Sequence, residues 1–91
     1  MIGTQHGTHV AHALPDAEQI QWRTSRFGAY EREREQAWTC TCRRIQYTLI
    51  HAGGVAFIRK VEDEKSVWDS PPTRLPEGEG LWTRLVMGEA R

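Results

Sequence analysis

The sequence predicts a small α+β domain: a three-stranded antiparallel β-meander packed with an N-terminal and a C-terminal helix, preceded by a flexible N-terminal tail. Two observations lead to this prediction. Two β-rich apolar runs, at residues 45–52 and 55–61, are joined by Gly53-Gly54, and two glycines supply the positive φ angles of a tight hairpin turn. Near the C-terminus, apolar residues recur at helical spacing after Pro76.

The length and composition fit one globular domain. The chain has 91 residues, 38% hydrophobic and 26% charged, which is enough for one core and too few for two. Residues 1–14 carry small and polar residues with few large apolar groups, so they predict a flexible tail. The single α+β domain is expected to span residues 15–91.

Residues 15–27 are predicted to form the N-terminal helix. Pro15-Asp16 is a typical helix start, and Ile20 and Phe27 are seven residues apart, which places both on one helical stripe. The run of alternating charge at residues 31–35 predicts a solvated helical face or a charged connector.

The hydrophobic pattern changes to a period of two from Trp38 onward. Apolar residues at positions 38, 40 and 42 have one parity and those at 45, 47 and 49 have the other, so the apolar face changes side at Arg43-Arg44. We expect a bulge or a strand break there, because an extra residue restores the register of a strand that crosses a bent sheet.

The two-residue loop fixes the pairing of the central hairpin. It places Ala52 opposite Val55, and the same register pairs 50 with 57 and 49 with 58. Residues 66–68 return as a short third strand that ends before Pro71-Pro72, which completes the meander.

The C-terminal helix is predicted to begin at Leu75-Pro76 and to stop at Gly88. Gly78 and Gly80 lie inside it, and each costs about 1 kcal/mol relative to alanine in a helix interior. This helix therefore needs tertiary packing in order to form.

Both faces of the hairpin are apolar, which is more than a sheet covered on one side requires. The chain's own helices can cover one face, and a second copy of the chain is the expected cover of the other. The leading hypothesis is a non-enzymatic binding or regulatory protein that acts through protein contacts as a homodimer. Its expected interface residues are Tyr47, Leu49, Ile50, Val55, Phe57 and Ile58.

An alternative hypothesis is a nucleic-acid-binding regulator with a basic patch on the sheet, formed by Arg43, Arg44, Arg59 and Lys60 clustered with Tyr47. The chain has twelve basic and twelve acidic residues, so no net charge draws it to nucleic acid, and the acidic residues at 62–64 offset the patch. The balance of charge favours the first hypothesis over this one.

Cysteine and histidine residues give a second alternative, a zinc-stapled domain. Cys40 and Cys42, with His6, His9 and His12, are ligand types that zinc takes. The cysteines lie in a predicted strand and the histidines in a predicted tail, whereas structural zinc sites use rigid turns. We therefore expect no bound metal and no cofactor.

No catalytic motif is present, so the protein is expected not to be an enzyme. A Cys40–His51 pair would need a partner chain, because His51 lies at the far end of the same predicted strand. No apolar run is long enough to span a bilayer and no signal peptide precedes the domain, so a cytoplasmic location without membrane contact is expected.

Overall fold

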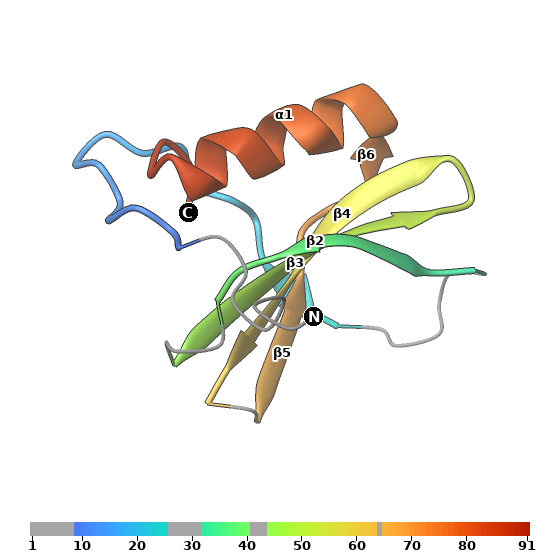
Figure 1. Cartoon of the computed structure of the whole chain (residues 1–91), viewed down its shortest axis with the longest axis horizontal. Helices are drawn as coiled ribbons and strands as arrows, with labels where there is room; N and C mark the ends of the chain where they lie inside the picture. Colours follow the sequence, from blue (N-terminus) through green and yellow to red (C-terminus); the bar gives the residue numbers. More distant parts are fainter. Residues whose placement is uncertain (1–8, 26–31, 41–43, 64) are drawn as a thin grey trace, which may run out of the picture.

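The computed structural model describes residues 9–25, 32–40, 44–63 and 65–91. In these residues a six-stranded antiparallel sheet is covered on one face by one helix (Figure 1). The sheet order is β1-β5-β4-β3-β2, with β6 also beside β4. The elements are β1 (Arg23–Thr24), β2 (Arg34–Trp38), β3 (Ile45–Ala52), β4 (Val55–Glu62), β5 (Ser66–Asp69), β6 (Thr73–Arg74) and α1 (Leu75–Val86).

The central hairpin is confirmed together with its register. β3 and β4 pair along their whole length, with Ala52 opposite Val55 at the turn. Gly53 and Gly54 have φ angles of 56° and 88°, which are the positive values expected of a two-residue primed turn.

The predicted third strand is also confirmed, as β5, and β4 lies at the centre of the sheet. One edge of β4 pairs with β3, while its other edge pairs first with β6 and then with β5. Between β5 and β6, Ser70 makes the hydrogen bonds to β4 that a strand residue would make. Its amide donates to Ile58 O, and its Oγ accepts from Ile58 N, both at 2.8 Å. Pro71 and Pro72 follow, and they have no amide hydrogen with which to continue the pairing.

Of the two alternatives predicted near Arg43-Arg44, one strand that continues across a bulge is wrong and a strand break is correct, because β2 ends at Trp38 and β3 begins at Ile45. The chain reverses between Cys40 and Arg44, so that β2 and β3 form a second antiparallel hairpin with Trp38 opposite Thr48. The change of parity therefore separates two paired strands, and Arg43, one of the two residues at which the bulge or break was predicted, lies outside the described residues. The register irregularity lies instead in β2, between Glu35 and Ala37.

The charged run forms no helical face where the structure describes it: Arg32 lies in a turn and Glu33 in an irregular segment, which agrees with the predicted connector. Arg34 and Glu35 begin β2, an outer strand of the sheet. Charged side chains and irregular register are common on edge strands, where they discourage pairing with other chains.

The N-terminal helix is the main error in the predicted architecture. Residues 15–25 contain no helix: Pro15 and Asp16 form a turn, Glu18 forms a parallel bridge with Ala90, and residues 26–27 lie outside the described residues. Ile20 and Trp22, two residues apart, both pack against the core. A spacing of two is typical of extended chain, and backbone pairing with the C-terminal segment outweighs any local helical preference. The predicted α+β content is present, but the three-stranded meander between two helices is replaced by a six-stranded sheet with a C-terminal helix.

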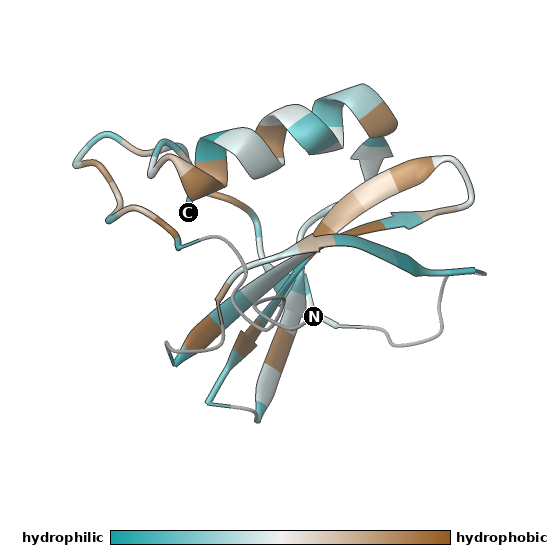
Figure 2. Ribbon diagram, viewed as in Figure 1, coloured by the Kyte–Doolittle hydropathy of each residue, from teal (hydrophilic) through white to brown (hydrophobic). Residues whose placement is uncertain are grey.

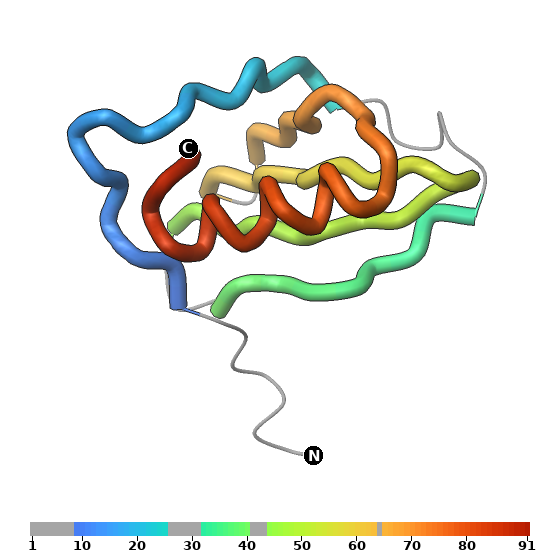
Figure 3. The backbone as a smooth tube through the Cα atoms, turned by 90° about the horizontal axis from the view of Figure 1, so that it is seen from above, coloured from blue at the N-terminus to red at the C-terminus, as the bar shows by residue number. Residues whose placement is uncertain are grey.

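The last part of the predicted tail is hydrogen-bonded to the C-terminal end of the chain. Ala11 N donates to Val86 O and Leu14 N donates to Gly88 O, at 2.9 and 2.8 Å. Figure 3 shows residues 9–25 passing around the C-terminal end of α1 and along the side of the helix away from β2. Residues 1–8 lie outside the described residues.

The C-terminal helix is confirmed, and its packing forms the main core. Gly78 is buried directly against Ala56 of β4, which lets the helix axis approach the sheet. Gly88 ends the helical segment with a φ of 84°. Figure 2 shows hydrophobic residues on β4 beneath α1 and hydrophilic residues at the outer end of β2. The buried core residues are Tyr47, Leu49, Ala56, Ile58 and Leu85.

The other face of the sheet, which we call the back face, has a smaller buried cluster. Ile50, Ala52 and Phe57 are 1%, 2% and 1% exposed. This face is therefore closed within a single chain at these positions. No helix in the described residues combines the length and the apolar composition needed to cross a bilayer.

Candidate anion-binding pocket

A pocket of about 630 Å³ lies beside the C-terminal end of α1, between the N-terminal segment and the sheet. Its volume falls within the range of roughly 300–1,000 Å³ typical of small-molecule sites. We call it the cationic pocket, because arginine and lysine side chains share it with apolar ones. The residues that line it are His9, Val10, Ala11, His12, Ala13, Thr39, Cys40, Arg44, Ile45, Tyr47, Lys60 and Arg91.

Strand alternation positions the floor of the cationic pocket. Leu49 of β3 and Ile58 of β4 lie in the core under α1. Tyr47 lies two residues before Leu49 and Lys60 two residues after Ile58, so both point to the same face as these core residues. Tyr47 and Lys60 are paired partners in the ladder. They lie on the helix side of the sheet, where the pocket opens.

Lys60 is held between aromatic rings. Its Nζ lies 4.6 Å from the ring centroid of Trp22 and 4.9 Å from that of Trp68, its partner on β5. Burial lowers the pKa of Lys60, against the opposing effect of Glu62. In the described part of the chain no carboxylate lies within ion-pairing distance of its ammonium group. The positive charge contacts the faces of two indole rings.

Arg91 supplies a second cation without a carboxylate partner among the described residues. Its Nη2 donates to Ala11 O, and its guanidinium carbon lies 5.9 Å from the Tyr47 ring centroid. Its Nε is buried and lacks a hydrogen-bond partner within the described chain. Its main-chain oxygen accepts from Trp22 Nε1 at 3.1 Å, which fixes the backbone of Arg91 at the pocket.

Arg44 also lines the pocket, but its charge is balanced. Its Nε and Nη2 donate to the two carboxylate oxygens of Asp63 at 2.8 and 2.7 Å. This bidentate pair raises the pKa of Arg44 and lowers the pKa of Asp63. The electrostatic attraction for an anion therefore comes mainly from Lys60 and Arg91.

The four residues of the predicted nucleic-acid patch are not brought together. Arg59 lies on the back face, opposite to Lys60, where its Nε donates to Asp69 at 2.9 Å and its Nη1 to Glu33 at 3.1 Å. Burial alone would lower the pKa of Arg59, but these hydrogen bonds outweigh it and raise the pKa. Arg44 and Lys60 share the cationic pocket, and Arg43 lies outside the described residues.

The residues of the predicted dimer interface lie within the fold of one chain. Five of the six are buried and Val55 is partly buried. The five buried residues divide between the core under α1 and the back-face cluster. The observation that motivated self-association, an apolar second face, is accounted for by burial within the chain. The buried residues are Tyr47, Leu49, Ile50, Phe57 and Ile58.

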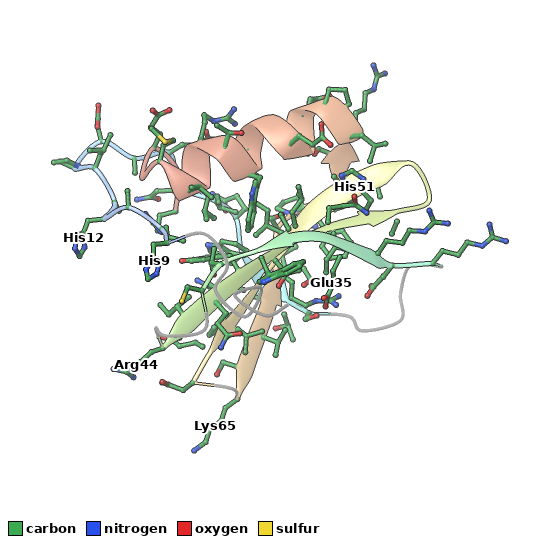
Figure 4. The ribbon with its side chains drawn as sticks, viewed as in Figure 1. His9, His12, Glu35, Arg44, His51 and Lys65 are labelled. Carbon is green, nitrogen blue, oxygen red and sulfur yellow. The ribbon has the colours of Figure 1, made fainter. Side chains whose placement is uncertain are left out.

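The predicted metal ligands are only partly assembled. His9, His12 and Cys40 all line the cationic pocket, and Figure 4 shows both histidines on the same side of the molecule as Arg44. Across the described ranges, no three histidine, cysteine or acidic side chains are grouped so as to hold a metal ion. His6 and Cys42 lie outside these ranges.

Cys40 and His51 are not brought together as a catalytic pair. His51 lies beneath α1 toward the Gly53-Gly54 turn, where its Nε2 is 3.5 Å from Glu79 Oε2 (Figure 4). Cys40 lies at the other end of β3, beyond the Thr39 amide that donates to Tyr47 O. Four strand positions separate Tyr47 from His51, which is about 13 Å of extended chain.

The sequence-based patch already grouped Lys60 with Tyr47, but the Trp22 and Trp68 rings beside Lys60 were missed. The predicted hairpin register already places Tyr47 opposite Lys60. Alternation along a strand also places Arg59 and Lys60 on opposite faces, which argues against one patch containing both. Comparisons with family models, curated proteins and solved structures find no significant match to this chain.

Proposed function

We propose that this protein is a binding module for a small organic anion that carries a flat ring, held in the cationic pocket. The observation that supports it most is Lys60: an ammonium group with aromatic neighbours and no carboxylate at ion-pairing distance in the described residues. Burying such a charge costs free energy unless an opposite charge or hydrogen bonds compensate it. A bound anion would provide that compensation.

The remaining lining fits the same class of ligand. The buried Arg91 Nε offers a hydrogen-bond donor that the described chain does not use. The Arg91 guanidinium lies over the Tyr47 ring, and Lys60 is the ladder partner of Tyr47. Tyr47, Ile45 and Val10 give an apolar surface for a ring. The ligand class therefore includes aromatic phosphates and carboxylates and single nucleotides.

A longer nucleic acid fits less well, although it was the sequence-based alternative. Phosphate contacts along a strand need several cations on one surface, whereas Arg59 is committed to Asp69 and Glu33 on the back face. Self-association and a cytoplasmic location, both expected from the sequence, stay predictions.

Isothermal titration with pyridoxine 5′-phosphate tests the proposal, and pyridoxine, which has the same ring without phosphate, is the uncharged comparison. Lys60→Gln and Arg91→Gln should each weaken binding by about 10- to 100-fold, as expected for a lost hydrogen bond to a charged group. Lys65→Gln is the matched control, because Lys65 is exposed at the turn after β4 and points away from the fold (Figure 4).

Binding should also weaken as salt concentration rises, because the pocket is open to solvent. Equal affinity for pyridoxine and its phosphate, or an equal loss in the Lys65 variant, would contradict the proposal. Circular dichroism of each variant shows whether the fold is retained.

A further inference from the structure

We propose that Lys60 forms a reversible imine with an aldehyde carried by an anion bound in the cationic pocket. This inference rests on the proposed function, since the anion must first occupy the pocket. It names the chemistry of the ligand more closely: a small molecule that bears both an aldehyde and a phosphate or carboxylate.

The geometry singles out one amine. The chain has two lysines, Lys60 and Lys65, and of these only Lys60 lines the cationic pocket. Its Nζ stands between the Trp22 and Trp68 rings, without a carboxylate at ion-pairing distance in the described residues to hold it as an ammonium ion. Arg91, against the same tyrosine that faces Lys60 across the ladder, is placed to hold the anionic group.

The chemistry is balanced without any further reactant. The neutral amine attacks the carbonyl carbon and forms a carbinolamine, and the carbonyl oxygen then leaves as water when the carbon–nitrogen double bond forms. The imine nitrogen takes up a proton and becomes an iminium ion. The lowered pKa of Lys60 enlarges the fraction of neutral amine that begins this sequence.

The indole rings suit the product as well as the starting amine. An iminium ion keeps the positive charge at the same nitrogen, so the cation–π contacts with Trp22 and Trp68 can persist. An exposed lysine such as Lys65 has neither these rings nor a neighbouring pocket for the anion.

The test uses pyridoxal 5′-phosphate, the aldehyde counterpart of pyridoxine 5′-phosphate. The mixture is followed by imine absorbance and then reduced with borohydride, and the labelled sites are mapped by mass spectrometry. Label on Lys60 should exceed label on Lys65 and on the α-amino group by about ten-fold or more, because binding raises the local aldehyde concentration. Pyridoxal, without the phosphate, should show little selectivity.

Two variants separate the imine from simple binding. Lys60→Arg keeps the positive charge, so it should still bind pyridoxine 5′-phosphate while losing the trapped product. Arg91→Gln should reduce label at Lys60 and leave label at Lys65 unchanged. If pyridoxine 5′-phosphate binds and Lys60 is not labelled above Lys65, the imine is overturned and the proposed function stands. If neither phosphate binds, both are overturned.

Discussion

Two glycines of α1, only two residues apart, should respond in opposite directions when each is replaced by alanine. A Cβ on Gly78 would lie 2.4 Å from the Cβ of Ala56 and 3.2 Å from Thr73 Oγ1. A Cβ on Gly80 would have the Arg84 guanidinium as its nearest neighbour, at 3.5 Å, which is an ordinary contact with a flexible group. Gly78 is therefore required by packing and Gly80 is not.

The expected magnitudes follow from these distances. Both substitutions gain roughly 0.5–1 kcal/mol of helix propensity. At Gly78 the helix must retreat from β4 by about 1 Å, and overpacking of this kind costs about 1–3 kcal/mol. We expect Gly78→Ala to destabilise the protein by about 1 kcal/mol and at most about 2.5 kcal/mol, and Gly80→Ala to stabilise it by up to about 1 kcal/mol.

Urea and thermal denaturation of the two variants beside the parent chain measure the effect. The two alanine variants should differ in Tm by on the order of 10 °C. Ala56→Gly combined with Gly78→Ala removes the clashing methyl group, so a double-mutant cycle should show a favourable coupling of about 1 kcal/mol. Equal stabilisation by both glycine substitutions would show that α1 is not seated on Ala56.

Three further outcomes are expected. Phe57→Asp should unfold the chain rather than separate two copies, with a loss above about 3 kcal/mol, because this side chain is buried within one chain; dichroism with light scattering distinguishes the two. Arg59→Gln should cost about 3 kcal/mol in urea denaturation at neutral pH, since it leaves Asp69 and Glu33 without their cation. Arg44→Gln should raise the pKa of Asp63 back toward its ordinary value in an NMR titration. The stability that this carboxylate contributes is present above its unfolded pKa and is lost as pH falls through its lowered folded pKa, so the variant should lose this part of the acid dependence.

Glycine and proline residues allowed the hairpin turn, the end of β5 and the bounds of α1 to be predicted from the sequence. The Gly53-Gly54 pair set the hairpin register, the paired prolines after β5 marked its end, and Pro76 with Gly88 bounded the helix. In each case one or two residues restrict the backbone whatever the rest of the chain does.

The errors concern positions where the pattern allows two interpretations and distant contacts decide between them. A change of parity is produced by a bulge within one strand and equally by a turn between two, and pairing of β2 with β3 selects the turn. Alternating charge suits a helical face and also an edge strand. The burial of the apolar back face within one chain depends on the tertiary arrangement, which the hairpin sequence does not contain.

The missing N-terminal helix and the missed pocket have the same physical origin. In a helix over residues 15–27 the backbone amides would hydrogen-bond within the helix. In the observed structure Glu18 N donates to Glu89 O, and Glu18 O accepts a hydrogen bond from Arg91 N. That pairing fixes Arg91 beside Tyr47 and brings the Trp22 ring against Lys60. The cationic pocket therefore exists because the two ends of the chain pair with each other as extended segments. Weakening the pairing at Glu18 should therefore reduce anion binding as well as stability, even though Glu18 does not line the pocket.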